Sequence, residues 1–65
     1  MPVVTVSGPP LDVERKRRLA RGLTDVMCEV YERPAGQIIV EIRENQPENV
    51  AVGGKLIADR QAGPR

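Results

Sequence analysis

The centre of the chain decides the fold: residues 12–32 read DVERKRRLARGLTDVMCEVYE and predict one long helix. Asp12 is a favourable N-cap, because its carboxylate can accept a hydrogen bond from a backbone N–H of the first turn. At helical spacing the larger apolar side chains fall in one stripe roughly 100° wide; they are Leu19, Leu23, Val26, Met27 and Val30. Pro34 cannot continue the helix. We therefore predict an amphipathic helix over about residues 13–32 that packs its apolar stripe on another element.

Two β-branched segments flank this helix. Residues 2–7 read PVVTVS and residues 37–43 read QIIVEIR, and both compositions are typical of strands. Alternation along the second segment places Ile38, Val40 and Ile42 on one face. A strand, a helix and a second strand predict a right-handed βαβ unit with the two strands parallel.

The last part of the chain predicts a small addition to this unit. Residues 50–52 form a short apolar run, and Gly53 and Gly54 follow it. Such a run between turn signals indicates a short extra strand or a hairpin. The predicted fold class is therefore α+β, with residues 1–65 as one domain: a single βαβ protomer and a short C-terminal strand or hairpin.

Size and composition indicate that this protomer needs other copies of itself. A chain of 65 residues buries only about 60% of its unfolded surface, and Tyr31, expected to fill the core, is its one aromatic residue. One cysteine excludes an internal disulfide, and the absence of histidine argues against a zinc site. Two parallel strands are only marginally stable alone and leave their edges open. We therefore expect a homo-oligomer built from dimers, without metal or cofactor.

Charge and hydropathy narrow the possible partners. The formal net charge is +1, whereas a nucleic-acid binder normally carries a marked basic excess. The chain has no signal-peptide pattern and no apolar run near 18 residues. We expect a soluble, cytoplasmic protein that binds neither nucleic acid nor membrane.

Pro2 is the strongest candidate for a catalytic group. Removal of Met1 ahead of this small residue would leave a secondary amine at the head of the first strand. An α-amino group has an unperturbed pKa of about 7.7–8.0, so modest burial makes it a free base near neutrality. The alternative is a strand that begins Met-Pro by chance.

Several features together resemble the 4-oxalocrotonate tautomerase family. They are Met1-Pro2 opening a strand, the break at residues 8–10, the helix start at Leu11-Asp12, and the segment NVAVGGKL at residues 49–56. The resemblance implies βαβ protomers that pair their strands across a dimer and often assemble as hexamers. It also implies a cofactor-independent isomerase that catalyses keto–enol tautomerisation of unsaturated 2-oxo acids, with the terminal proline as general base.

Matched to the family, the base falls on Pro2 and the apolar wall of the site falls on Val50 and Val52. The family usually has a large aromatic residue where this chain has Val50. Its two substrate-binding arginines fall on Leu11 and Ile39, so neither is present, and Ile39 would join Val50 and Val52 in the apolar walls around Pro2. Because each arginine would bind a carboxylate or polarise the 2-oxo group, their loss predicts a small monocarboxylic or neutral substrate.

Other cations are candidates to replace the missing pair. Arg33, at the end of the helix, is the candidate in the same chain as Pro2, with a pair to Glu29 as the alternative. Five further candidates lie at the far end of the strands and could reach only a neighbour's Pro2; they are Arg15, Lys16, Arg17, Arg18 and Arg43. The run at residues 15–18 has three interpretations: pairing with Glu41, Glu44 or Glu48, carboxylate binding at a neighbour's site, or nucleic-acid binding.

Two further functions remain open. The same fold could add water to an unsaturated acid as a hydratase or dehalogenase, with Pro2 as the acid. It could also be a non-catalytic oligomeric homologue, which a retained Met1 would favour because Pro2 would then have an amide nitrogen.

Overall fold

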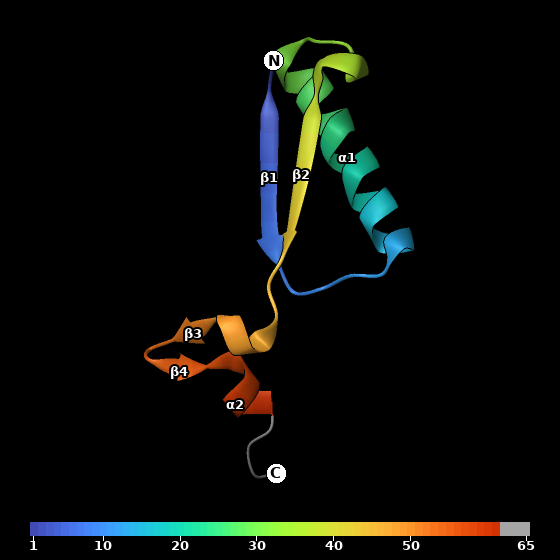
Figure 1. Cartoon of the computed structure of the whole chain (residues 1–65). Helices are drawn as coiled ribbons and strands as arrows, with labels where there is room; N and C mark the ends of the chain where they lie inside the picture. The colour runs from blue at the N-terminus through green and yellow to red at the C-terminus, as the bar shows by residue number, and fades with distance from the viewer. Residues whose placement is uncertain (62–65) are drawn as a thin grey trace.

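The computed structural model describes residues 1–61, and its largest part is a parallel strand pair with one helix packed against it (Figure 1). Strand β1 (Val3–Gly8) leads into helix α1 (Val13–Tyr31), which returns to strand β2 (Ile39–Glu44). The strands pair in parallel from Val3 opposite Ile39 to Gly8 opposite Glu44. This confirms the predicted βαβ unit, although β1 begins one residue and β2 two residues later than the sequence suggested.

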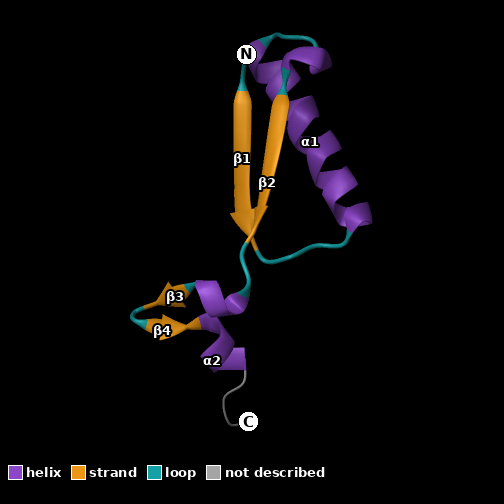
Figure 2. Cartoon of the chain, viewed as in Figure 1, coloured by secondary structure: helices purple, strands orange, loops and turns teal. Residues whose placement is uncertain are grey.

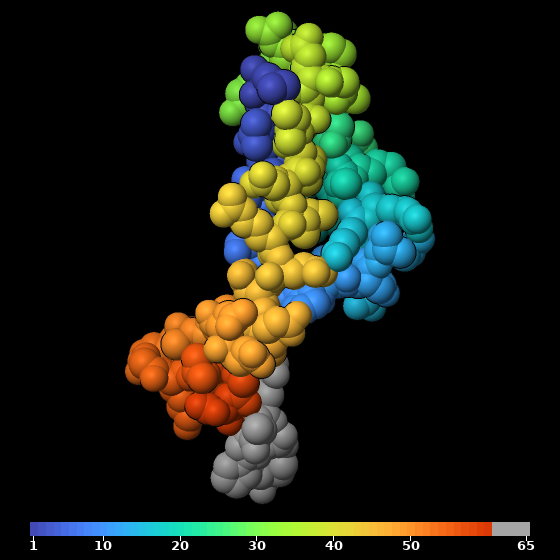
Figure 3. Space-filling view, in the orientation of Figure 1, coloured from blue at the N-terminus to red at the C-terminus, as the bar shows by residue number. Residues whose placement is uncertain are grey.

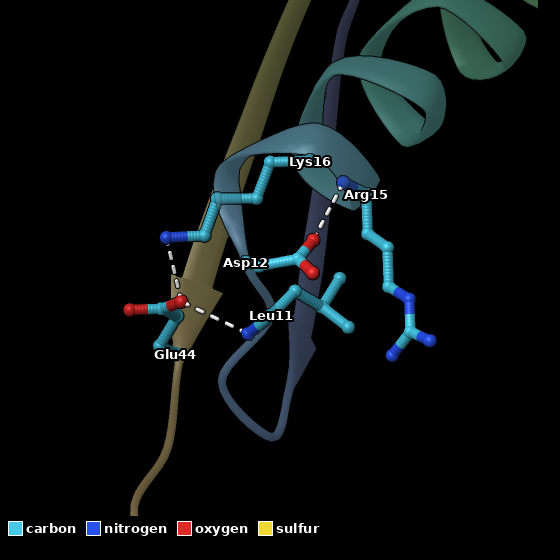
Figure 4. Close-up of polar contacts among 5 residues, drawn as sticks. All are labelled: Leu11, Asp12, Arg15, Lys16 and Glu44. Carbon is cyan, nitrogen blue, oxygen red and sulfur yellow. Dashed lines mark hydrogen bonds and ion pairs between the residues drawn. The ribbon is translucent and has the colours of Figure 1, made fainter.

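Both ends of α1 are capped. The Asp12 carboxylate accepts a hydrogen bond from the Arg15 backbone N–H at 2.8 Å, which confirms the predicted N-cap (Figure 4). At the other end Glu32 takes a left-handed conformation, with φ 54°, and its N–H donates to the Cys28 carbonyl. The helix therefore ends at Tyr31, one residue earlier than predicted.

The helix covers one face of the strand pair and lies mainly against β2. Alternate strand residues face it, as predicted for Val40 and Ile42, and these positions are half-buried. The half-buried side of α1 carries Leu19, Leu23 and Met27, together with Ala20, Thr24 and Cys28. Three residues expected in the core are instead exposed: Val26 by 57%, Val30 by 70% and Tyr31 by 55%. The prediction was wrong there, because the half-buried side of the helix is completed by Ala20, Thr24 and Cys28 and not by Val26 and Val30.

A second, smaller unit follows β2 (Figure 2). A 3-10 turn (Pro47–Asn49) leads to strand β3 (Ala51–Val52), which pairs antiparallel with β4 (Lys55–Leu56), and helix α2 (Ile57–Gln61) follows. The turn between the strands has φ +63° at Gly53 and +83° at Gly54, values that only glycine adopts without strain. The predicted hairpin is confirmed.

The protomer is elongated, and it leaves apolar surface uncovered. It measures 49 × 24 × 14 Å, with a radius of gyration of 15.7 Å, against about 11 Å for a compact domain of this length. The space-filling view shows the hairpin unit as a lobe beside the βαβ body (Figure 3). Among the residues whose exposure is described, none is fully buried. Apolar side chains stay exposed on the free sheet face (Val3, Ile39), on α1 and on the hairpin (Val52, Leu56).

No helix in the described part of the chain combines the length and the apolar character needed to cross a membrane.

Candidate active site

Pro2 lies directly before β1 and is half-buried. Its carbonyl accepts a hydrogen bond from the Ile39 backbone N–H at 3.0 Å, which ties the start of the chain to the start of β2. Ile39 is 39% exposed and sits opposite Val3 on the face of the strands away from α1. The structure thus joins the backbones of two residues expected at the site. While Met1 remains attached, the Pro2 nitrogen is a peptide nitrogen and has no basicity.

Arg33 lies at the same end of the molecule, just after the last turn of α1 (Figure 1). Its backbone N–H donates to the Cys28 carbonyl at 3.3 Å, and its side chain is exposed. Within residues 1–61 the pair with Glu29 that the sequence suggested is not formed. Arg33 is therefore a cation near the Pro2 end that is not held by Glu29.

The other expected site residues lie at the opposite end of the strand pair. Leu11 precedes α1, Val50 precedes β3, and Val52 is in β3 and 52% exposed. Arg43 is near the end of β2, opposite Ser7, and its guanidinium pairs with the Glu41 carboxylate at 3.3 Å. The length of β1, roughly 17 Å at 3.3 Å per residue, separates this group from Pro2. One copy of the chain therefore does not bring Pro2 together with Val50 and Val52.

A cavity of about 500 Å³ opens where the carboxyl ends of the strands meet the hairpin unit. That volume is within the range of small-molecule sites, which are mostly apolar with a few placed polar groups. Seven residues line it: Ser7, Gly8, Pro9, Asn45, Pro47, Val50 and Ile57. None of them is charged. The amide of Asn45 donates a hydrogen bond to the Ser7 hydroxyl oxygen at 2.7 Å, so the two polar side chains lie side by side in an apolar wall.

A polar cluster fixes the corner next to this cavity (Figure 4). One carboxylate oxygen of Glu44 lies 2.6 Å from the Lys16 ammonium and accepts a hydrogen bond from the Leu11 backbone N–H at 3.2 Å. These two interactions, that with Lys16 first, hold the pKa of Glu44 below its ordinary value. The cluster therefore ties the end of β2 to the start of α1.

The basic run at residues 15–18 divides between two environments. Lys16 pairs with Glu44, one of the carboxylates expected from the sequence, and Arg17 lies 3.4 Å from Glu14 within the helix. Arg15 and Arg18 border a shallow hollow of about 350 Å³ together with Leu11 and Leu19. Ion pairing accounts for Lys16 and Arg17. Arg15 and Arg18, at the hollow, remain candidates for carboxylate binding.

Sequence reasoning missed Ser7 and Asn45. A signal was present, because both are polar residues at the carboxyl ends of two strands predicted to be parallel, and such ends meet at one edge of a sheet.

Comparison with known proteins shows the family. Residues 2–60 match the model of the tautomerase enzyme family, and the chain therefore belongs to it. DmpI from Archaeoglobus fulgidus is 50% identical with a TM-score of 0.83, over 89% of this chain and 100% of DmpI. TomN, a 4-oxalocrotonate tautomerase homologue in the tomaymycin biosynthetic pathway, is 28% identical with a TM-score of 0.89, over 98% of this chain and 100% of TomN. A search of curated proteins found no significant match.

A third similar structure is that of a heterohexameric 4-oxalocrotonate tautomerase from Chloroflexus aurantiacus J-10-fl. It is 24% identical with a TM-score of 0.77, over 91% of this chain and 95% of the other, and this likeness shows the fold alone. The resemblance stated from the sequence is confirmed at the level of family and fold.

Proposed function

We propose that this protein is a cofactor-independent tautomerase that uses Pro2, freed by removal of Met1, as its general base. The observation that supports this most is the position of Pro2, which is half-buried directly before β1 in a chain of the tautomerase family. Apolar surroundings favour the uncharged form of an amine, which is the form that accepts a proton.

The reaction needs only one base. The amine takes a proton from the hydroxyl group of a dienol, or from a carbon conjugated with a carbonyl, and the electrons of the broken bond leave a dienolate with its charge mainly on oxygen. The ammonium then returns the proton to a carbon of this dienolate, and the carbonyl group re-forms. The base is regenerated, so no cofactor is consumed.

The site is completed by a second copy of the chain. In one protomer the strand pair separates Pro2 from Val50 and from the cavity that Val50 lines. The exposed apolar residues on the sheet, on α1 and on the hairpin give a second copy surface to cover. We expect a dimer-based assembly, and by analogy with the Chloroflexus relative a hexamer, in which one copy's Pro2 would lie against another copy's Val50 and Val52.

The substrate is a small monocarboxylic or neutral enolisable carbonyl compound. Leu11 and Ile39 stand where the family has arginines, and no cation lines the cavity. A second carboxylate would therefore go unpaired, and an unpaired charge at an apolar wall is strongly unfavourable.

The experiment compares two forms of the chain: the processed protein, which begins at Pro2, and a form with one residue ahead of Pro2. Acylation removes the basicity of the nitrogen, so kcat/KM for a 2-hydroxy-2,4-dienoate should fall by about 10²–10⁴. Intact mass confirms the N-terminus, and light scattering confirms that both forms assemble alike. Equal turnover by both forms would show that Pro2 is not the base.

A further inference from the structure

The cavity between the strand ends and the hairpin unit contains a pair of polar side chains that have no role in the proton transfer by Pro2. Five of its seven lining residues offer no polar side chain, and the other two are Ser7 and Asn45, hydrogen-bonded to each other at 2.7 Å. They are 38 residues apart in the chain and meet because the ends of β1 and β2 are adjacent.

These two side chains have donor capacity to spare. Asn45 uses one amide hydrogen on the Ser7 hydroxyl oxygen, which leaves it a second amide hydrogen, and the Ser7 hydroxyl keeps its own hydrogen to donate. Within the described residues neither side chain makes another hydrogen bond. Two neighbouring donors in an uncharged wall suit one oxygen atom that gains negative charge as a reaction proceeds.

The backbone around the pair is held in place. The Asn45 backbone N–H donates to the Gly8 carbonyl at 2.8 Å, which extends the pairing of β1 and β2 by one more bond. On the hairpin side, the Ile57 backbone N–H donates to the Val50 carbonyl at 2.8 Å, so the apolar wall opposite is also fixed. Donors that are already oriented need little reorganisation when charge develops.

We infer that Ser7 and Asn45 bind the carbonyl or enolate oxygen of the substrate, while its hydrocarbon part lies against Val50 and Ile57. The ligand class is a small, uncharged or monocarboxylic ketone or enol, and any carboxylate it has stays outside the cavity because no cation lines the wall. The reaction itself rests on the proposed function, in which Pro2 of another copy moves the proton. The binding of the oxygen does not depend on that base.

A binding experiment isolates the cavity from the chemistry. The assembled protein with one residue ahead of Pro2 has no free base, so it cannot turn a ligand over. Phenol serves as a stable enol, and toluene as a ligand of similar size without the hydroxyl group. NMR titration should shift the Asn45 side-chain amide and the Val50 and Ile57 methyl groups on adding phenol, and Asn45→Ala should weaken phenol binding roughly fivefold or more.

Matched variants make the result specific. Toluene binding should be unchanged by Asn45→Ala, because the apolar wall is intact. Asn49→Ala replaces a nearby asparagine that does not line the cavity, and it should bind phenol like the parent. Phenol affinity that is insensitive to Asn45→Ala, or shifts confined to another surface, would overturn the inference.

Kinetics of the processed protein separate this inference from the proposed function. Asn45→Ala and Ser7→Ala should each lower kcat/KM for a 2-hydroxy-2,4-dienoate roughly tenfold or more, and Asn45→Ser, which keeps a donor, should recover part of the loss. If kcat/KM is unchanged in all three variants, the inference is wrong and the proposed tautomerase function is unaffected. If the processed protein binds phenol in a way that depends on Asn45 but shows no turnover, the proposed function is wrong and the binding site at the cavity stands.

Discussion

The two ends of the β1–β2 pair differ in what they offer to catalysis. The amino end has Pro2, hydrogen-bonded to the Ile39 backbone, but neither residue lines the cavity of about 500 Å³ or the hollow of about 350 Å³. The carboxyl end has a cavity of about 500 Å³, but no titratable side chain lines it. The proposed base and this cavity therefore lie at opposite ends of one strand pair.

This difference supports the proposal that a single protomer does not form a complete active site. Strand pairs of this kind are only marginally stable in isolation, and apolar residues at both ends remain exposed, Val3 by 54% at the amino end and Val52 by 52% on the hairpin. The same contact between copies that covers these residues is the one that would join the base to the pocket. In our proposal, the same contact between copies therefore stabilises the assembly and completes the active site.

The largest expected effect comes from mixing two inactive chains. One carries an extra residue ahead of Pro2, and the other carries Val50→Asp, whose carboxylate would spoil the apolar wall and keep a nearby amine protonated. If the site lies between copies, the refolded mixture contains sites with an intact base from one chain and an intact wall from the other. Its kcat/KM should exceed that of either parent by roughly tenfold or more, since each parent lacks an effective general base.

The control for this mixture is assembly, because each parent must form oligomers of the same size by light scattering. A mixture no more active than its parents would mean that base and wall come from the same chain. The proposal that the site lies between two copies of the chain would then be wrong.

The second effect concerns charge at the carboxyl end. Leu11→Arg restores a guanidinium where the family has one, and a charged hydrogen bond to a second carboxylate should raise kcat/KM for a dicarboxylate, relative to a monocarboxylate, roughly tenfold. Leu11→Met is the matched neutral control. If the unaltered protein already prefers dicarboxylates, other cations bind the second carboxylate. Alanine substitutions at Arg15, Arg18 and Arg43 would identify them.

Sequence patterns predicted the elements of this fold well, because each was encoded locally. The N-cap at Asp12, the β-branched strands and the Gly53-Gly54 turn are read from a few neighbouring residues, and the structure has all of them. The face of α1 that packs was predicted less well. A helical wheel shows where apolar residues cluster, but the sheet decides which side is covered, and Val30 stayed 70% exposed.

The candidate site was only partly predictable for a similar reason. Pro2 and Ile39 were identified from sequence, and the structure joins them through one hydrogen bond. The cavity was not foreseen, because its walls come from β1, the residues after β2 and the start of α2, and only the fold brings these together. Nothing near Ser7 or Asn45 in the sequence marks either as a site residue, and the two meet only because β1 and β2 pair in parallel.

A third, smaller effect tests whether the turn between β3 and β4 needs glycine at residue 54. Gly54 has φ +83°, and a Cβ added there meets no atom within 4 Å, so Gly54→Ala strains only the backbone. The expected cost is about 1–2 kcal/mol, measured by guanidinium unfolding. Gly36→Ala is the matched control, because its Cβ also meets nothing within 4 Å and no positive φ opposes it. Equal stability of the two variants would show that the turn does not need glycine.

The smallest effect is the pH response of the corner beside the cavity. In the folded protein the Lys16 ammonium, and then the Leu11 backbone N–H, lower the pKa of Glu44 below the ordinary value of 4.5. A carboxyl group with a lowered folded pKa stabilises the fold above its unfolded pKa, and this stabilisation is lost as the pH falls through the folded value. Thermal unfolding at pH 7 should therefore show a slightly lower Tm for Glu44→Gln than for the parent, and the gap should close below about pH 4.5.

The control for this prediction is Glu48→Gln, which alters an exposed carboxylate on the 3-10 turn that pairs with neither Lys16 nor Leu11. It should leave Tm and its pH dependence close to those of the parent. High salt should narrow the Glu44→Gln gap at pH 7, because the pair with Lys16 is partly exposed and ions screen it. A gap that persists unchanged at pH 3 would show that Glu44 acts through packing and not through its charge, and the corner that holds Leu11 would then not depend on ionisation.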